Sequence, residues 1–243
     1  TVSVTSPGGV ASLTATTQMT NGSGWLTVSP SSANTPASFS VAVTPQNLAA
    51  GTYTGTVTIS SPTSTSPVTI AVTLTVQSIP PPNATAIVNS ASFVSGAVAP
   101  GEIITIGGTG MAGANDSYGL QLESGLVATK LGDTRVLFDG IAAPLVYVSA
   151  NQVNAVVPHN VSGRVSTRIQ VEYKGVTGSA IELRVVDSAP AIFTQNQSGT
   201  GPGAISNQNF SLNTASNPAA RGSVVVVYAT GEGQTSPVGV NGS

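Results

Sequence analysis

His159 is the single histidine of the chain, and a histidine beside a serine and a carboxylate is the arrangement that activates a nucleophile. The carboxylates considered for that role are Asp133, Asp139 and Asp187. No G-x-S-x-G elbow occurs in the sequence, however. His159 also follows Val157-Pro158 at the end of an apolar run, so we expect it in a surface turn. The sequence therefore predicts no catalytic triad and no enzyme activity.

Four acidic residues that fall within one region are the candidates for a calcium site: Asp116, Glu123, Asp133 and Asp139. Calcium usually takes several oxygen ligands at close spacing, as in D-x-[DN]-x-[DN]-G, and these acids lack that spacing. Nothing suggests a cleft in which two of them could cleave a glycoside. Because the chain has no cysteine, disulfides, thiol chemistry and cysteine zinc sites are excluded. We expect no metal and no cofactor.

Two aromatic residues could bind a sugar, since an exposed ring is a platform for an apolar ligand face. Trp25 is the only tryptophan, and Tyr53 lies in a run that alternates with Val57 and Ile59. That alternation points Tyr53 inward, and Trp25 at the start of a strand could equally close the core. Both interpretations, a core residue and a glycan contact, stay open for each.

Charge is scarce and unevenly distributed along the 243 residues. Lys, Arg, Asp and Glu make up 7% of the chain, and the first of them is Glu102. Residues 1–101 therefore offer almost nothing that could act as a general acid or base. Seven Lys and Arg residues cannot follow a phosphate backbone, so nucleic-acid binding is not expected. No apolar run is long enough for membrane insertion, and the opening residues lack the basic region of a signal peptide, which suggests a mature form or an excised piece.

The elements between these residues are strands. Val68–Val76 alternates over nine residues, which predicts Val68, Ile70, Val72, Leu74 and Val76 inward and the threonines outward. Phe39–Val43 and Tyr53–Ile59 alternate in the same way, and Gly and Pro clusters separate the runs. No amphipathic helix of ten or more residues is visible. The predicted fold is all-β, a tandem of immunoglobulin-like β-sandwiches of which the last is incomplete.

Three consecutive prolines, Pro80-Pro81-Pro82, mark the clearest linker, because they favour an extended polyproline conformation. The predicted organisation is a sandwich at 1–77, a linker at 78–86, a second sandwich at 87–188 and the first part of a further module at 189–243.

An internal repeat supports the third module. Asn89–Ser92 precedes Gly101–Gly110, and Asn213–Ser216 precedes Gly222–Gly231, each with an N-x-A-S start and two glycines nine positions apart. The first copy continues into further strand patterns at 134–139, 143–148, 152–157, 167–174 and 179–186. The second copy ends at Ser243, soon after its opening strand.

That opening strand is unusually apolar, with Val224, Val225, Val226, Val227 and Tyr228 in succession. Such a strand without partners would expose both faces and a backbone edge. We therefore expect Ser223–Tyr228 to be covered by the second domain, by a strand from a neighbouring copy, or by further C-terminal sequence. Strand addition between copies is a way to build surface filaments.

The first domain carries the motif W-L-x-V-S-P at Trp25–Pro30, then G-x-Y-x-G-x-V-x-I at Gly51–Ile59, then the strand that ends at Val76. In these residues it resembles a BACON-type β-sandwich. The resemblance implies a module that is either a spacer or a binder of carbohydrate or mucin.

The rest of the chain resembles the Ig-like C-terminal module common in large secreted proteins of acidobacteria. The matching residues include Ala99-Pro100-Gly101-Glu102, Val136–Leu145, Gln152–Pro158 and Tyr228–Thr235. The resemblance implies an Ig-like fold and a cell-surface or extracellular location, without catalytic residues to carry over.

The expected function is that of a non-catalytic, secreted or cell-surface modular protein of bacterial origin: a structural spacer, an adhesive scaffold or a subunit of a surface filament. The alternative is a carbohydrate-binding module of a larger secreted protein. The expected partners are neighbouring copies or glycans.

Overall fold

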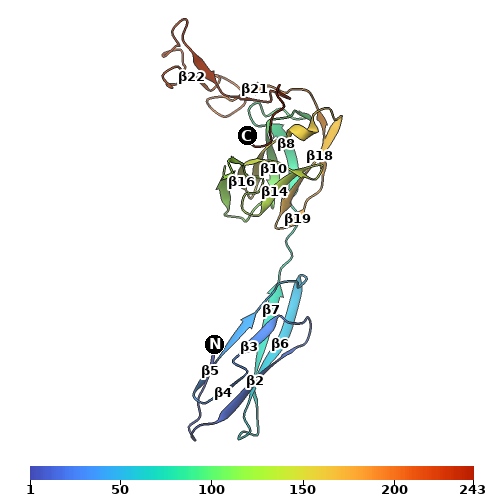
Figure 1. Cartoon of the computed structure of the whole chain (residues 1–243), viewed down its shortest axis with the longest axis vertical. Helices are drawn as coiled ribbons and strands as arrows, with labels where there is room; N and C mark the ends of the chain where they lie inside the picture. Colours follow the sequence, from blue (N-terminus) through green and yellow to red (C-terminus); the bar gives the residue numbers. More distant parts are fainter. The chain divides into compact units, whose positions relative to one another are not determined.

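Alternating valine and threonine patterns dominate the chain, and its computed structural model, which describes residues 1–243, contains 24 β-strands and one 3₁₀ turn, η1 (His159–Val161). The residues divide into two units, Thr1–Ser78 and Ile79–Ser243. Figure 1 shows both units as layered strands with almost no helix. None of the helical structure has the length and apolar character needed to cross a membrane. The all-β prediction is confirmed.

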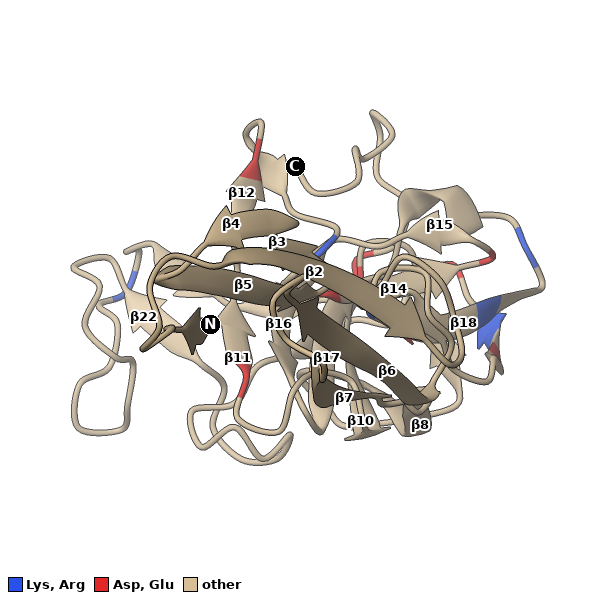
Figure 2. Cartoon of the chain, turned by 90° about the horizontal axis from the view of Figure 1, so that it is seen from below, with Lys and Arg blue, Asp and Glu red and all other residues tan.

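The first unit is a sandwich of two antiparallel sheets. One sheet has the order β1-β5-β3 and the other β4-β2-β6-β7. The strands are β1 (Val2–Val4), β2 (Ser12–Met19), β3 (Leu26–Ser29), β4 (Ser32–Asn34), β5 (Ala37–Val43), β6 (Gly51–Ser60) and β7 (Val68–Val76). Threonines, which favour strands, cover the outer faces of this unit. No Lys, Arg, Asp or Glu occurs before Glu102, and Figure 2 accordingly shows β2 to β7 without charged residues.

The core of this unit forms around Trp25, Leu26, Phe39 and Val57, which are all buried. Gly55 in β6 is the second glycine of the G-x-Y-x-G motif, and it lies at a place where a side chain would not fit. A Cβ at this position would lie 2.8 Å from the Gln18 carbonyl oxygen, 3.0 Å from the Leu26 side chain and 3.3 Å from the Trp25 ring. The absence of a side chain on β6 therefore makes room for the tryptophan.

The predicted burial of β7 is wrong in degree. Its alternation has the expected sense, because Ile70, Val72 and Leu74 pack against the core while the threonines are exposed. These side chains are only half-buried, however, and Val68 is 62% exposed. The reason is that β7 is the edge strand of its sheet, a position that alternation alone does not reveal.

Two further details of the first unit differ from the prediction. Val43, expected on the buried face with Phe39, is exposed at the end of β5. Strand β2 was not predicted, although Leu13 and Ala15 alternate inward along it.

The second unit contains a larger sandwich. A five-stranded sheet has the order β11-β16-β17-β10-β8, and the facing sheet has the order β15-β14-β18-β20-β9, with β19 paired to β18. All pairings are antiparallel except β20 with β9. The strands are β8 (Asn83–Asn89), β9 (Ala97–Val98), β10 (Ile103–Thr109), β11 (Ser117–Gly119), β14 (Thr134–Phe138), β15 (Ile141–Ala142), β16 (Leu145–Ser149), β17 (Gln152–Val156), β18 (Ser166–Tyr173), β19 (Val176–Thr177) and β20 (Ile181–Val185).

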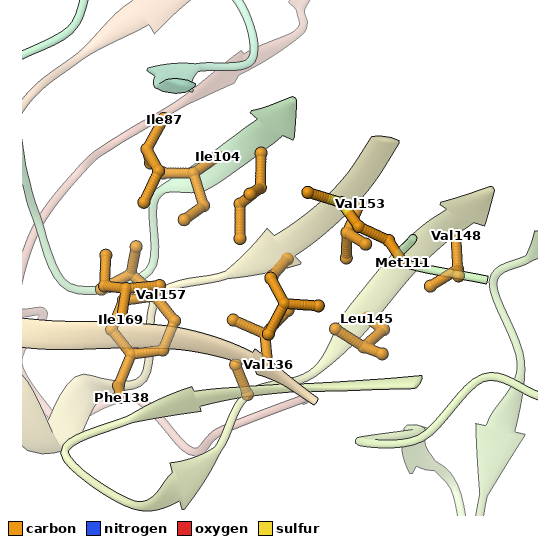
Figure 3. Packing of buried hydrophobic residues seen from close by; sticks show 14 of the residues in the cluster. Ile87, Ile104, Met111, Val136, Phe138, Leu145, Val148, Val153, Val157 and Ile169 are labelled. Carbon is orange, nitrogen blue, oxygen red and sulfur yellow. The ribbon is translucent and has the colours of Figure 1, made fainter. Parts of the chain in front are cut away.

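The inner faces of these two sheets meet in one apolar core. Figure 3 shows side chains from both sheets converging there, among them Ile104, Val153, Phe138 and Ile169. The predicted strand regions at 134–139, 143–148, 152–157, 167–174 and 179–186 each overlap one of these strands, so those predictions are confirmed within two residues at either end. A separate hairpin joins β12 (Leu122–Glu123) to β13 (Leu126–Val127).

The predicted linker at 78–86 is too long. Strand β8 already begins at Asn83 and pairs with β10, so residues 83–86 belong to the sandwich. The segment between β7 and β8 therefore ends with the prolines at 80–82.

Residues 189–243 form two small ladders instead of a sandwich. Strand β21 (Ala191–Ile192) pairs with β24 (Ala229–Thr230), and β22 (Ile205–Asn207) pairs with β23 (Val225–Val227). The final residues run back over the sandwich, where the Val127 amide donates to the Gly242 carbonyl at 2.8 Å.

Candidate functional site

The residues considered for a catalytic triad do not meet. No hydrogen bond or ion pair joins His159 to Asp133, Asp139 or Asp187. The His159 backbone amide donates to the Asn241 side chain at 2.8 Å, and Gly239 packs against its ring. His159 therefore lies under the C-terminal segment, where its Nδ1 is buried without a hydrogen-bond partner. His159 begins the turn η1 after β17, so the predicted turn is confirmed, but the residue is half-buried and not at the open surface.

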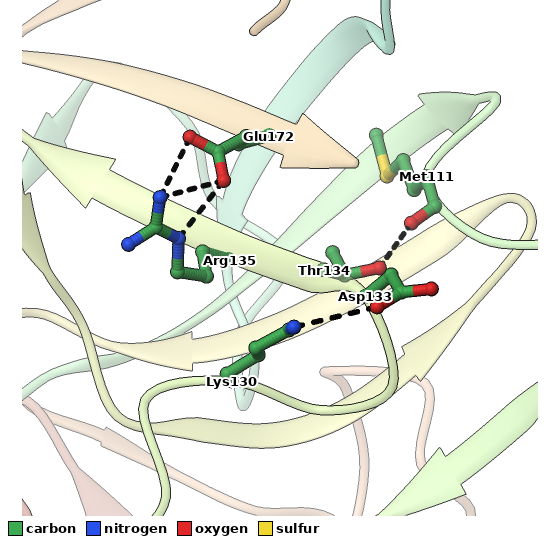
Figure 4. Close-up of polar contacts among 6 residues, drawn as sticks. All are labelled: Met111, Lys130, Asp133, Thr134, Arg135 and Glu172. Atoms are coloured by element: carbon green, nitrogen blue, oxygen red, sulfur yellow. Dashed lines mark hydrogen bonds and ion pairs between the residues drawn. The ribbon is translucent and has the colours of Figure 1, made fainter. Parts of the chain in front are cut away.

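The four acids considered for calcium are also dispersed. Asp116 accepts a hydrogen bond from the Gly113 amide, and Asp133 pairs with Lys130 at 3.3 Å on the surface. Figure 4 shows that pair beside the bidentate contact of Arg135 with Glu172. No three His, Cys, Asp or Glu side chains are grouped so as to hold a metal.

Asp139 has a structural environment of its own. It accepts hydrogen bonds from the Arg168 amide at 2.9 Å, from the Thr167 hydroxyl at 2.8 Å and from Arg164 at 3.0 Å. The backbone hydrogen bond, supported by these neighbours, lowers the pKa of this carboxyl below its usual value. The arrangement stabilises the turn after β14.

The proposed sugar platforms face inward. Trp25 is buried, and its indole NH donates to the Asn21 carbonyl at 3.0 Å. Tyr53 is half-buried against it, with ring centroids 6.3 Å apart, and its hydroxyl donates to Ala49. Trp25 therefore presents no exposed ring to a ligand, and the interpretation of this pair as core residues is the one that the geometry supports.

Glu102, the first charge of the chain, is fully buried where β10 begins. Its carboxylate accepts hydrogen bonds from the Asn89 side chain at 2.8 Å and from the Ala99 amide at 2.7 Å. Burial raises the pKa of Glu102, and these two donors oppose the rise. Asn89 Oδ1 accepts from the amides of Ala91 and Ser92. The N-x-A-S and A-P-G-E motifs thus meet at one buried polar cluster.

The same cluster ties the sandwich to residues 189–243. Asn89 Nδ2 also reaches the Ala189 carbonyl at 3.2 Å, and the Ile103 amide donates to the Thr230 hydroxyl at 2.7 Å. Thr230 is itself buried. Its position is therefore determined by the sandwich as well as by its own ladder.

The structure corrects the alignment of the internal repeat. In β8–β10, Asn89 pairs with Ile104 and Ile87 with Ile106. In β22–β23, Asn207 pairs with Val225 and Ile205 with Val227. The counterpart of Asn89 is therefore Asn207, with the shared sequence Ala-Ile-x-Asn, and not Asn213.

The turn that precedes β10 and the turn that precedes β23 agree with this alignment. The Glu102 amide donates to the Ala99 carbonyl, and the Ser223 amide donates to the Ala220 carbonyl. Ser223 thus stands where the first copy has Glu102. The third module begins with the same hairpin as the second.

Of the three covers expected for Ser223–Tyr228, the structure contradicts one, cover by the second domain. Only Val225–Val227 forms a strand, and its one partner is β22. Val225 is 41% and Val227 46% exposed, and Val224, Val226 and Tyr228 are exposed as well. The second domain does not cover this strand.

A groove of about 760 Å³ opens on the outer face of the five-stranded sheet. Its floor comes from β10 and β17, where Thr105 pairs with Asn154 and Gln152 lies two residues away. Its lining also includes three aromatic rings, Phe93, Phe193 and Tyr228. These residues are far apart in the sequence and are brought together because residues 189–243 pack beside β10.

The groove has an entirely uncharged lining. It consists of Ser90, Ala91, Phe93, Ile103, Thr105, Val146, Gln152, Asn154, Phe193, Thr194, Gln195, Gln197, Ala204 and Tyr228. Sequence reasoning missed it. The available signal was the alternation of Gln152 and Asn154 with buried Val153 and Ala155, which leaves two amides on an outer face.

Comparison with protein families gives one match. Residues 86–184 match the model of the IPT/TIG domain, an Ig-like fold, and that range contains all strands of the larger sandwich but the first residues of β8 and the last of β20. IPT/TIG domains are common in cell-surface and receptor proteins. A search of curated proteins finds no match to the chain. No family model matches the first unit as a BACON module.

Proposed function

We propose that this chain is a non-catalytic, modular part of a secreted or cell-surface bacterial protein, in which it acts as a spacer or adhesive scaffold. The observation that carries the proposal is the repeated hairpin. Strands β8–β10 and β22–β23 begin two modules in series with the same register and the same turn. Serial modules of one fold are the usual construction of extended surface proteins.

Two other features support this role. The IPT/TIG domain at residues 86–184 belongs to a class common at cell surfaces. The first unit has a neutral surface of threonine and serine hydroxyls, with Trp25 in its core as a spacer sandwich requires. We include in the proposal that residues 1–77 are a BACON-like spacer, supported by the W-L-x-V-S-P motif and by the place of Gly55 under Trp25.

Neighbouring copies are the proposed partners, through addition of a strand to β23. The support is the free edge of β23, which lacks the neighbour that β17 supplies to β10 in the complete module. Light scattering of the 243-residue chain tests this part. Concentration-dependent assembly that is lost in Val227→Pro is expected. The Tyr228 amide donates to the Ala204 carbonyl next to β22, so the alternation of an antiparallel ladder places the Val227 amide on the free edge, where proline removes the donor.

Surface labelling tests the location. Antibodies raised against this chain should stain intact cells of the source bacterium, and external protease should remove the signal. Staining that requires permeabilised cells would overturn the surface role. The matched control is an antibody against a cytoplasmic protein, which should stain permeabilised cells only.

A further inference from the structure

We infer that the groove between β10–β17 and residues 193–228 is a binding site for a neutral glycan. The inference concerns a ligand for one groove and does not depend on the proposed spacer role. It rests on the shape, the uncharged lining and the arrangement of rings and amides in the groove.

The size and position of the groove are those of a ligand site. Its volume of about 760 Å³ lies within the roughly 300–1,000 Å³ typical of such sites. It lies where residues 189–243 pack beside the sandwich within one compact unit. Two direct hydrogen bonds hold these two parts together beside it, from Asn89 to Ala189 and from Ile103 to Thr230.

Aromatic rings line the groove. Phe93 is 46% and Tyr228 49% exposed, although both are large side chains that favour burial. Such rings offer flat apolar faces to the C–H face of a pyranose while the tyrosine hydroxyl remains available for hydrogen bonds. Phe93 is held in position by its unusual backbone, with φ of 57°, and by its amide donating to the Asn89 carbonyl at 2.8 Å.

The floor supplies a donor and an acceptor side by side. Gln152 Nε2 donates to Asn154 Oδ1 at 2.8 Å, which leaves Gln152 Oε1 and Asn154 Nδ2 without a protein partner. One acceptor next to one donor matches a pair of neighbouring sugar hydroxyls, since each hydroxyl can both donate and accept. An acyl chain in the same place would bury these amides without partners, at a cost.

The uncharged lining selects against ionic ligands. None of the lining residues is Lys, Arg, His, Asp or Glu, so a bound sulfate, phosphate or uronate would lose its hydration without gaining a counter-charge. The ligand class that satisfies the rings, the amides and the neutrality together is an uncharged oligosaccharide.

Calorimetric titration of the full chain tests the inference. The probes are cellohexaose, laminarihexaose, mannohexaose and xylohexaose, with hexagalacturonate as the charged comparison and hexaproline as a peptide that also prefers aromatic grooves. At least one neutral hexasaccharide should bind with a Kd below about 10 mM. Absence of such binding, or tighter binding of hexagalacturonate or hexaproline than of every neutral sugar, overturns the assignment.

Substitutions locate the binding. Tyr228→Ala and Asn154→Ala should each weaken it by about tenfold or more, and Tyr228→Phe should keep most of it. The matched control is Phe210→Ala. Phe210 is the exposed phenylalanine of the equivalent turn in the third module, with φ of 62° and 79% exposure, and it lies outside the groove.

Phe210→Ala should leave the affinity within about twofold of the parent chain. Binding that persists in both Tyr228→Ala and Asn154→Ala places the ligand elsewhere and overturns the inference. Because these side chains are not buried in either core, both variants should fold, and their thermal midpoints verify it. If Tyr228→Ala proves unstable, Asn154→Ala alone decides.

Discussion

The hairpins β8–β10 and β22–β23 share register and turn but differ in what surrounds them. In the first, Ile104 and Ile106 are fully buried between two sheets, and β17 pairs with the far edge of β10. In the second, the equivalent Val225 and Val227 are about half exposed, and the far edge of β23 is unpaired. The register and turn of the hairpin are therefore specified by its own residues, whereas burial in a core stabilises it only in the complete sandwich.

The residue that precedes the second strand also differs between the two hairpins. Glu102 in the complete module is held by Asn89 and Ala99 inside the protein, whereas Ser223 at the equivalent place is half-buried and bonds only to Ala220. Asn207 keeps the role of an organising amide, with bonds to Asn217 and Asn213. A charge is thus buried only where the surrounding module supplies donors for it.

The largest expected difference is in core truncation. Ile104→Ala should lower the free energy of unfolding of the second unit by about 2–5 kcal/mol, because it leaves a cavity in a packed core. Val225→Ala should change it by less than about 0.5 kcal/mol. Urea unfolding of the full chain measures both.

Ile104→Ala removes more atoms than Val225→Ala, so Val153→Ala in β17 serves as the size-matched control. It removes the same atoms as Val225→Ala from a buried site and should lower the free energy of unfolding by about 1.5–3 kcal/mol. Equal losses for Val153→Ala and Val225→Ala would mean that β23 is covered in solution.

The second difference is in backbone protection. Amides of β10 lie between two neighbouring strands, whereas those of β23 have one, so β23 should exchange hydrogen about a hundredfold faster or more. Hydrogen exchange followed by NMR on the full chain resolves the two strands. Comparable protection would show that β23 gains a partner, and dilution would then distinguish a neighbouring copy from an internal contact.

The third difference concerns pH. Since the folded-state pKa of Glu102 is raised, the native state holds this proton more tightly than the unfolded state. The associated stability is complete below the ordinary pKa near 4.5 and is lost as pH rises through the raised value. Unfolding of Glu102→Gln should lack this loss.

Ser223→Ala is the matched control and should leave the pH profile of stability unchanged. A Glu102→Gln profile that is parallel to that of the parent chain between pH 4 and pH 8 would show that burial does not raise the pKa of this carboxyl.

The smallest expected effect is in the first unit. It contains no charged side chain, so its thermal midpoint should shift by no more than a few degrees between about pH 4 and 9 or with added salt. Trp25, the only tryptophan, is buried there, so its fluorescence reports this unit selectively in the full chain. A larger shift would contradict this expectation.

Much of the fold could be predicted because its signals are local. The alternation in Val68–Val76 predicted β7 with the correct bounds and the correct inward face. It did not predict that Val68 is exposed, because the order of strands in a sheet depends on partners distant in sequence. The N-x-A-S motif and the glycine spacing predict the repeat but align Asn213 with Asn89, whereas the pairing of Asn207 with Val225 identifies Asn207 as the counterpart.

The candidate groove could not be predicted in the same way. Gln152 and Asn154 were recognisable as outer-face residues of a strand, but their neighbours Phe93 and Tyr228 come from segments on either side in the sequence. Trp25 and Tyr53 were chosen because their type suits a sugar, and the structure uses both in the first unit's core. Residue type suggests chemistry, whereas accessibility depends on packing.

By itself, the sequence determined the all-β class, the strand pattern and the charge-free first unit, because period-two alternation, proline and glycine breaks and composition act over a few residues. Only the tertiary structure decided which strands lie at edges, that Glu102 is buried, that β23 has a free edge, and that a neutral groove forms beside β10. Each of these depends on contacts between residues tens of positions apart, and the free energy of such contacts is set by burial and pairing in the assembled sheets.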